Sequence, residues 1–232
     1  MLSGETDLKR ALAHVLWIGG PPDAGKTSIA QLLARKYKLQ VYRFDRREMD
    51  HIARADPARQ PALAAFGARL RELDERAFSE DLWVARPPAA MARETIACWS
   101  ERFGLAIEDL LAVPPAPPLV AEGPGFFPEC VAPLIADRRK AVWLVPSEAF
   151  KRASVARRNK PGARDLTSDP ERATRNLIDR DLLMGRHVRQ RARALGLTVC
   201  EVDGARGLDE MAALVEAHFA PWLSAPGSLP GP

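Results

Sequence analysis

Cysteine is scarce in this 232-residue chain, and long hydrophobic runs are missing from it. The three cysteines are odd in number and far apart, which indicates neither a disulfide framework nor a zinc site: Cys98, Cys130 and Cys200. No segment approaches the roughly 20 consecutive apolar residues that a membrane-spanning helix needs. The first apolar stretch, residues 11–18, runs directly into glycines and lacks the form of a signal peptide. We therefore expect a cytoplasmic protein with no membrane partner.

Neither sign of charge dominates the sequence. The net charge is +4, and 28% of the residues are charged against 47% hydrophobic and 6% aromatic. The excess is mainly arginine, which fits binding of a phosphorylated ligand, although an ordinary solvated surface predicts it nearly as well. Nucleic acid is not an expected partner at so small an excess. The length suffices for one sizeable core with a helical insertion.

Short apolar runs that alternate with helical patterns predict an α/β fold with a five-stranded parallel sheet. Alternation of this kind favours right-handed β-α-β connections. The expected strands are residues 14–18, 41–44, 119–121, 141–145 and 197–202. A last helix is expected to turn one hydrophobic stripe toward the core, formed by Leu208, Met211, Leu214, Val215 and Phe219.

Several segments depart from this alternation. Residues 46–118 form a long, mostly helical insertion that closes in the proline-rich stretch 114–118, and residues 151–169 are rich in arginine. Ser147 and Asp169 are plausible helix N-caps, the latter followed by Pro170. We expect one domain over residues 1–223 and a disordered tail over 224–232, which contains only Ser, Ala, Pro, Gly and Leu.

One motif carries most of the functional information. Residues 20–27 read GPPDAGKT and match G-x-x-x-x-G-K-[ST], with an apolar strand before them and an amphipathic helix after them. Such a loop wraps its backbone N–H groups and the helix N-terminus around phosphate oxygens. The sequence therefore predicts a nucleoside triphosphate site formed by Gly20, Pro21, Pro22, Asp23, Ala24, Gly25, Lys26, Thr27 and Ser28.

The loop residues have distinct expected roles. Lys26 should reach the β- and γ-phosphates, and the Thr27 hydroxyl should ligate Mg²⁺. Asp23 is unusual, because many such loops have Gly, Ser or Ala there and a carboxylate repels phosphates unless it turns outward. An unusual role for Asp23, such as orienting an acceptor or a metal-bound water, stays open.

The chain resembles the small-molecule and nucleoside-monophosphate kinase branch of the phosphate-loop proteins. The resemblance rests on the opening WIGGPP at residues 17–22, an acid closing the second strand, the arginine-rich segment after the fourth and VDG at 202–204. Shikimate-kinase-like and chloramphenicol-phosphotransferase-like enzymes have the most similar organisation. The resemblance covers residues 14–222 and implies a three-layer P-loop NTPase fold, ATP, Mg²⁺ and a small-molecule acceptor.

Two acids that follow strands are candidates for chemistry. The resemblance gives Asp45, at the end of the second strand, the role of base for the attacking hydroxyl; capping a helix or pairing with Arg46 or Arg47 is the alternative. Asp50 is a weaker candidate for the base. Glu122 follows the third strand and could hold a magnesium-bound water, or it could be a solvated turn residue.

The arginine-rich segment lies where the resembling kinases have a mobile lid. Cations that close over the transferred phosphoryl group are expected to come from Arg157, Arg158 and Arg164, with Arg152 and Lys160 nearby. A solvated basic helix face is the plainer interpretation. The loop after the fifth strand should lie along the base and contact it through the backbone at Ala205, while Asp203 could cap the next helix.

Four aromatic residues could line an acceptor pocket, although core packing is the commoner use of such residues: Phe126, Phe127, Trp83 and Trp99. The histidines have no spacing that indicates chemistry. The predicted function is transfer of the ATP γ-phosphoryl group to a hydroxyl of a small molecule. A nucleotide-binding switch without an acceptor and a polynucleotide 5′-kinase are the rivals, and the sequence leaves the acceptor and the oligomeric state open.

Overall fold

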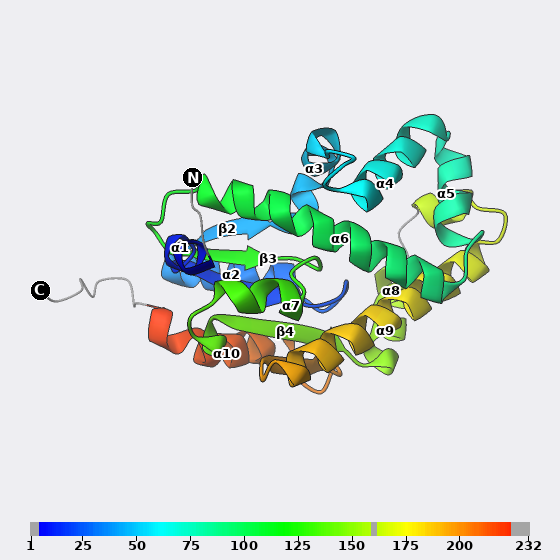
Figure 1. Cartoon of the computed structure of the whole chain (residues 1–232). Coiled ribbons are helices and arrows are strands. Elements are labelled where there is room, and N and C mark those ends of the chain that lie inside the picture. The colour runs from blue at the N-terminus through cyan, green and yellow to red at the C-terminus, as the bar shows by residue number, and fades with distance from the viewer. Residues whose placement is uncertain (1–4, 159–161, 224–232) are drawn as a thin grey trace, which may run out of the picture.

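The computed structural model describes residues 5–158 and 162–223. Its centre is a five-stranded sheet, all parallel, in the order β2-β3-β1-β4-β5 (Figure 1). The strands are β1 Val15–Gly19, β2 Gln40–Arg43, β3 Leu119–Glu122, β4 Ala141–Pro146 and β5 Thr198–Val202. Each predicted strand is confirmed to within one residue at either end, and so are the α/β class and the five-stranded parallel sheet.

Helices occupy most of the remaining chain. The α-helices are α1 Glu5–Ala11, α2 Lys26–Tyr37, α3 Glu48–Arg54, α4 Pro61–Glu72, α5 Glu75–Trp83, α6 Pro88–Leu111, α7 Pro128–Val131, α8 Glu148–Arg158, α9 Pro170–Ala194 and α10 Leu208–Phe219. The 3₁₀ helices are η1 Phe44–Arg47, η2 Ala132–Leu134, η3 Arg138–Lys140, η4 Ala163–Leu166 and η5 Ala220–Trp222. Within the described residues, no helix combines the length and the apolar character that crossing a bilayer requires.

The sheet lies between two layers of helices. On one face, Ile29 and Leu33 of α2 and Val215 of α10 pack against buried side chains of β1, β3 and β4. On the other face, α6 and α9 contact each other and diverge over the sheet, with α7 between them (Figure 1), and they contribute residues such as Leu110 and Val188 to a second buried cluster. Burial on both faces explains why β1, β3 and β4 read as apolar runs.

Helix α10 differs from the prediction in two of its five stripe residues. Met211, Val215 and Phe219 are buried, but Leu208 is 47% exposed and Leu214 is 40% exposed. Met211, Val215 and Phe219 are spaced by four and share one face of the helix, whereas Leu214 lies on its flank. Leu208 is the first residue of the helix, where the chain has only begun to approach the sheet.

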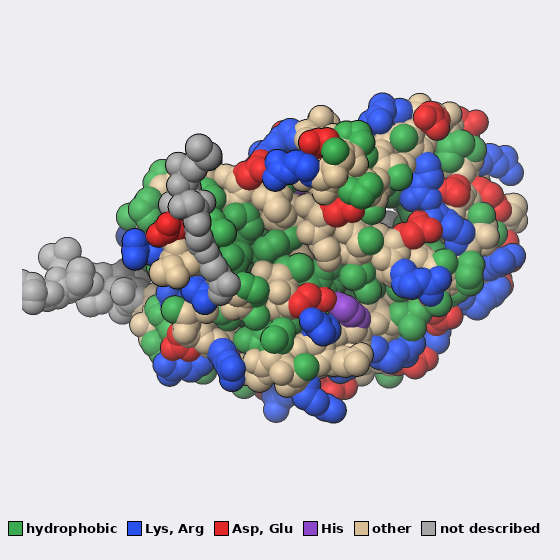
Figure 2. Space-filling view, viewed as in Figure 1, with side chains coloured by type: hydrophobic (Ala, Val, Ile, Leu, Met, Phe, Trp, Pro, Cys, Tyr) green, Lys and Arg blue, Asp and Glu red, His purple; other side chains and the backbone are tan. Residues whose placement is uncertain are grey.

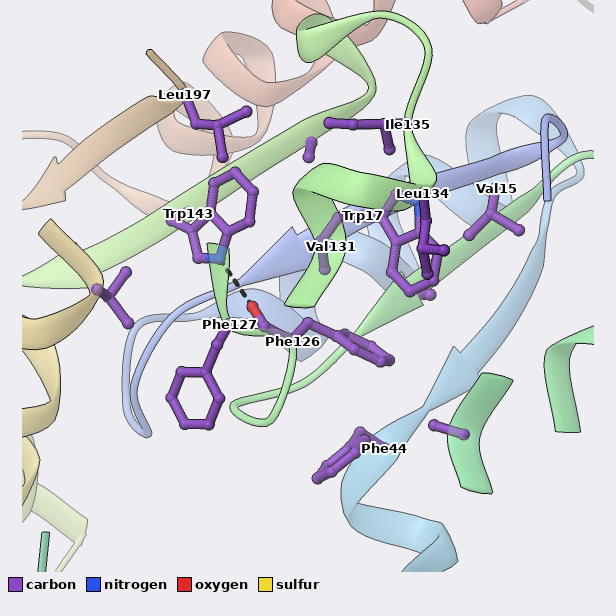
Figure 3. Close-up of a cluster of buried hydrophobic side chains, with 14 of the residues drawn as sticks. Val15, Trp17, Phe44, Phe126, Phe127, Val131, Leu134, Ile135, Trp143 and Leu197 are labelled. Atoms are coloured by element: carbon purple, nitrogen blue, oxygen red, sulfur yellow. Dashed lines mark hydrogen bonds between the residues drawn. The ribbon is translucent and has the colours of Figure 1, made fainter. Parts of the chain in front are cut away.

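Of the two uses weighed for Phe126 and Phe127, the structure shows core packing and not the wall of a pocket. Both side chains are fully buried in the core between the sheet and the α6–α9 layer, as Figure 3 shows. The Trp143 indole donates a hydrogen bond of 2.7 Å to the Phe126 carbonyl, and the Phe126 ring lies edge-on to Trp17. This packing fixes the segment that follows β3.

The segment between β2 and β3 is helical from η1 to the end of α6. Helices α3, α4 and α6 share a small core of their own, formed by Ile52, Leu63, Cys98 and Leu105. The long α6 contributes residues both to this core and to the core on the sheet, so one helix packs against the insertion and the sheet (Figure 1).

The predicted helix starts are also confirmed. Asp169 caps α9 by accepting from the Arg172 N–H, and the Ser147 hydroxyl accepts from the Phe150 N–H in the first turn of α8. His14, predicted within the first strand, lies one residue before it. The predicted disorder of residues 224–232 and the position of Lys160 near the lid arginines concern residues outside those that the structure describes.

Candidate functional site

The loop over residues 20–27 joins β1 to α2 at the carboxyl edge of the sheet. Gly20 has φ of 118°, and a Cβ there would lie 2.0 Å from the Leu144 carbonyl oxygen. Gly25 has φ of 81°, with open space where a Cβ would stand. Glycine is needed at the first position for close approach to β4 and at the second for the left-handed turn into α2.

The N-terminus of α2 faces the inside of this loop. Gly25 is its N-cap residue and supplies no side-chain hydrogen bond. The first backbone N–H groups of a helix have no partner within the helix, and the helix dipole makes this end attractive to anions. The loop, with Lys26, Thr27 and Ser28 beginning the helix, is therefore suited to hold an anionic group.

Lys26 is buried under the loop. Its ammonium group donates a hydrogen bond of 2.8 Å to the Pro21 carbonyl. Burial lowers the pKa of Lys26, while the negative charges of Glu122 and Asp45 act in the opposite direction. An anion arriving in the loop would stabilise the charged form of this lysine in the same way.

Thr27 and Glu122 come together although they are 95 residues apart. The Thr27 hydroxyl donates a hydrogen bond of 2.9 Å to Glu122 Oε1, and the Arg43 Nε lies 3.4 Å from the same oxygen. Burial raises the pKa of Glu122, partly offset by Lys26 and Thr27. The second carboxylate oxygen, Oε2, is buried without a hydrogen-bond partner among the described residues. An unused buried carboxylate oxygen beside a hydroxyl is a donor set that fits Mg²⁺.

Asp45 lines a cavity of about 600 Å³ that reaches the loop. It is the second residue of η1, which follows β2, and it is exposed; Pro22 of the loop and Pro124 after β3 line the same cavity. Parallel strands end at one edge of the sheet, and this explains why segments following β1, β2 and β3 meet here. A molecule in this cavity would lie between Asp45 and the loop.

The helical insertion supplies most of the wall of this first cavity. Its apolar part includes Phe66, Trp83, Met91 and Trp99 from α4, α5 and α6. The two tryptophans proposed from sequence thus line it, unlike the two phenylalanines after β3.

Charged groups occupy the rim of the first cavity. Arg86 forms ion pairs with Asp81 and Glu94, and Arg69 approaches the same two acids. Glu48 pairs with the buried Arg102, and burial raises its pKa. The charges at the rim are therefore largely matched.

A second cavity, of about 610 Å³, lies on the other side of the loop. It is bounded by the loop, by α8 and by the turn after β5, through residues that include Gly25, Phe150, Arg157, Asp203 and Gly204. Ala205 does not line this cavity. Its N–H donates a hydrogen bond of 2.9 Å to Asp203 Oδ1, so Asp203 stabilises the turn.

The three predicted lid arginines separate in the structure. Arg157 and Arg158 both line the second cavity, and Arg157 lies 5.8 Å from the centre of the Phe150 ring. Arg164 in η4 lines neither cavity and donates a hydrogen bond of 3.2 Å to the Thr174 hydroxyl. The η4 segment packs against α5 of the insertion, which carries Arg164 away from the loop.

Sequence reasoning missed Lys151. Its side chain is fully buried and forms ion pairs with Asp23 of the loop and Asp181 of α9. The available signal was helical periodicity: Lys151 and Arg158 are seven residues apart and therefore share a face of α8. Asp23 and Asp181 are both far from Lys151 in the sequence, so no local pattern indicates that they pair with it.

A separate acidic cluster lies outside both cavities. Asp50, His51 and Asp109 bring their ligand atoms close enough for a metal ion. Both acids, however, are paired with Arg47 and Arg54. Burial would raise the pKa of Asp109, but hydrogen bonds from Arg54, His51 and Arg47 bring it below its ordinary value. The cluster is satisfied by its own cations.

Comparisons with known proteins do not assign the chain to a family. No protein-family model matches it, and a search of curated proteins finds no similar sequence. The loop and its two cavities are therefore the features that bear on function.

Proposed function

We propose that the protein transfers the γ-phosphoryl group of ATP, with Mg²⁺, to a hydroxyl group of a small molecule. The observation that carries the proposal is the contact between Thr27 and Glu122 under a glycine-bounded loop with a buried lysine. A nucleotide-binding loop needs a hydroxyl and an acid at this place; Thr27 comes from the first turn of α2 and Glu122 from the end of β3.

The donor nucleotide would be held on the loop and in the second cavity. Loop amides and Lys26 would contact the phosphates, and the turn around Gly204 would border the base. Thr27 and the free oxygen of Glu122 would hold Mg²⁺, directly or through water. When bound, the ion neutralises charge on the β- and γ-phosphate oxygens.

The acceptor would occupy the first cavity, with its hydroxyl facing the loop. Asp45 is exposed to this cavity and can accept the proton of that hydroxyl as the oxygen attacks phosphorus. The aromatic and apolar wall excludes water that would otherwise compete as an acceptor. Arg157 and Arg158 at the second cavity supply positive charge for the transferred group; Arg164, which packs elsewhere, is not included.

The two alternative functions, a nucleotide-binding switch and a polynucleotide 5′-kinase, account for fewer of these features. A switch protein without an acceptor has no use for a cavity of about 600 Å³ that opens beside Asp45. A polynucleotide kinase needs a basic channel, and on the face seen in Figure 2 basic and acidic side chains are interspersed.

A screen for ADP release tests the proposal. The protein is incubated with ATP and Mg²⁺ and a panel of nucleosides, aminoglycosides, phenicols, sugars and metabolite alcohols. We expect one chemical class to stimulate ADP release and to yield a phosphorylated product detectable by mass spectrometry. Failure of calorimetry to detect any binding of ATP with Mg²⁺ would overturn the proposal.

A further inference from the structure

Asp23 is the least expected residue of the loop. Its φ of 68° places a non-glycine residue in the left-handed region, a conformation that costs free energy and is kept only where the surroundings hold it. Its carboxylate accepts a hydrogen bond of 2.5 Å from Lys151 and forms an ion pair with Arg158 through the other oxygen. Both cations come from α8, so Asp23 binds the loop to that helix.

These groups belong to a row of five alternating charges. Arg158 pairs with Asp23, Asp23 with Lys151, Lys151 with Asp181, and Asp181 with Arg180. The inner members are almost completely buried: Lys151 has no exposed side-chain surface and Asp181 has 1%. Arg158 differs, because 65% of its side chain is exposed.

The difference in burial decides which cation can leave Asp23. Lys151 is enclosed between Asp23 and Asp181, so moving it would remove the buried cation that these two carboxylates share. Arg158 is the last residue of α8 and lines the second cavity. If it leaves Asp23, only an ion pair with a mostly exposed guanidinium group is lost. An anion that enters this cavity would compete with Asp23 for Arg158.

Burial alone would raise the pKa of Asp23, but Lys151 and Arg158 bring it below its ordinary value. The carboxylate is therefore charged at neutral pH. It also stands within the loop, and a like charge there opposes a polyphosphate.

We propose that Asp23 acts as an internal competitor of the nucleotide's phosphates, occupying Arg158 and thereby limiting affinity for nucleoside di- and triphosphates. The inference rests on the proposed function, since it assumes that phosphates bind the loop. Arg158 is then the lid arginine that exchanges a carboxylate for a phosphate, and Lys151 is a positioning residue that holds Asp23 in place.

The test is calorimetric affinity for ATP with Mg²⁺, ADP with Mg²⁺ and inorganic triphosphate. Asp23→Asn retains the size of the side chain and removes its charge, and we expect affinity to rise roughly 10- to 100-fold. A purely structural role would lower affinity instead. Asp23→Gly, which suits the left-handed conformation, should show the same gain even if the asparagine variant folds poorly.

Two further variants complete the experiment. Arg158→Gln, added to Asp23→Asn, should remove most of the gain in affinity, because that gain comes from the arginine that Asp23 no longer occupies. Asp179→Asn is the matched control. Asp179 is a half-exposed carboxylate of α9 that pairs with Arg152 of α8, and its removal should leave the affinity for ATP unchanged.

The outcomes separate the two proposals. If the wild-type protein binds nucleotide and neither Asp23 variant binds it more tightly, the inference about Asp23 is overturned while the proposed function stands. If no variant and no wild-type protein binds any of the three ligands, both proposals fail.

Discussion

The two cavities beside the loop have nearly equal volumes, about 600 and 610 Å³, yet their walls are built differently. The second is bounded by the loop itself, by the turn after β5 with two glycines, and by side chains of α2, α8 and α10. The first is walled by large side chains of three insertion helices. One site is thus formed around the loop and the other mainly by the insertion. Substitutions in the insertion should accordingly change acceptor choice and leave nucleotide binding unchanged.

The largest effect is expected in the loop, which borders both cavities. Lys26→Ala removes the buried ammonium group, and we expect it to abolish measurable ATP binding and turnover. Lys36→Ala, an exposed lysine of the same helix that pairs with Glu216, is the control and should behave like wild type. Unchanged ATP affinity in Lys26→Ala by calorimetry would reject the assignment of the loop.

Asp45→Asn should separate the two sites. It retains the shape of the side chain but cannot accept a proton, so transfer should slow by roughly 10²–10⁴-fold while ATP affinity is retained. The measurement is single-turnover transfer with the acceptor found by the screen. Asp50→Asn is the control, because Asp50 pairs with Arg47 and Arg54 and lines neither cavity. A wild-type rate in Asp45→Asn would exclude the base role.

Phe66→Leu should sharpen the contrast between the cavities. Phe66 lines only the first, so we expect the KM for the acceptor to rise roughly 10-fold and the KM for ATP to stay constant. Phe78→Leu alters the ring that contacts Phe66 without touching the cavity, and it controls for lost packing. Equal changes in both KM values would contradict separate donor and acceptor sites.

The smallest effect on catalysis is expected at the cluster outside both cavities. Asp109→Asn should lower the free energy of unfolding by about 1–3 kcal/mol at pH 7, since Asp109 accepts hydrogen bonds from charged groups. The pKa of Asp109 is lowered by folding, so its contribution is present above its ordinary pKa near about 4 and is lost as pH falls below it. The difference in the free energy of unfolding between Asp109→Asn and the wild-type protein, measured by urea denaturation, should therefore become smaller at acid pH. An unchanged difference would contradict the pKa shift.

The elements predicted from sequence were those with local signals. Most strands are apolar runs, the more mixed β2 excepted, and the loop is a contiguous motif with fixed flanks, so both could be located without distant residues. The pairing of Lys151 with Asp23 could not, because these residues are 128 positions apart and meet only when α8 folds over the loop. Phe126 and Phe127 were ambiguous for a related reason: core and pocket residues have the same composition, and only packing distinguishes them.

The most direct test of the central claim is a crystal structure with Mg²⁺ and a non-hydrolysable ATP analogue. We predict the triphosphate within residues 20–27, the ion beside Thr27 and Glu122, and the base in the cavity bordered by Phe150 and Gly204. Nucleotide bound elsewhere, or absent at saturating concentration with this loop unchanged, would contradict the proposed function.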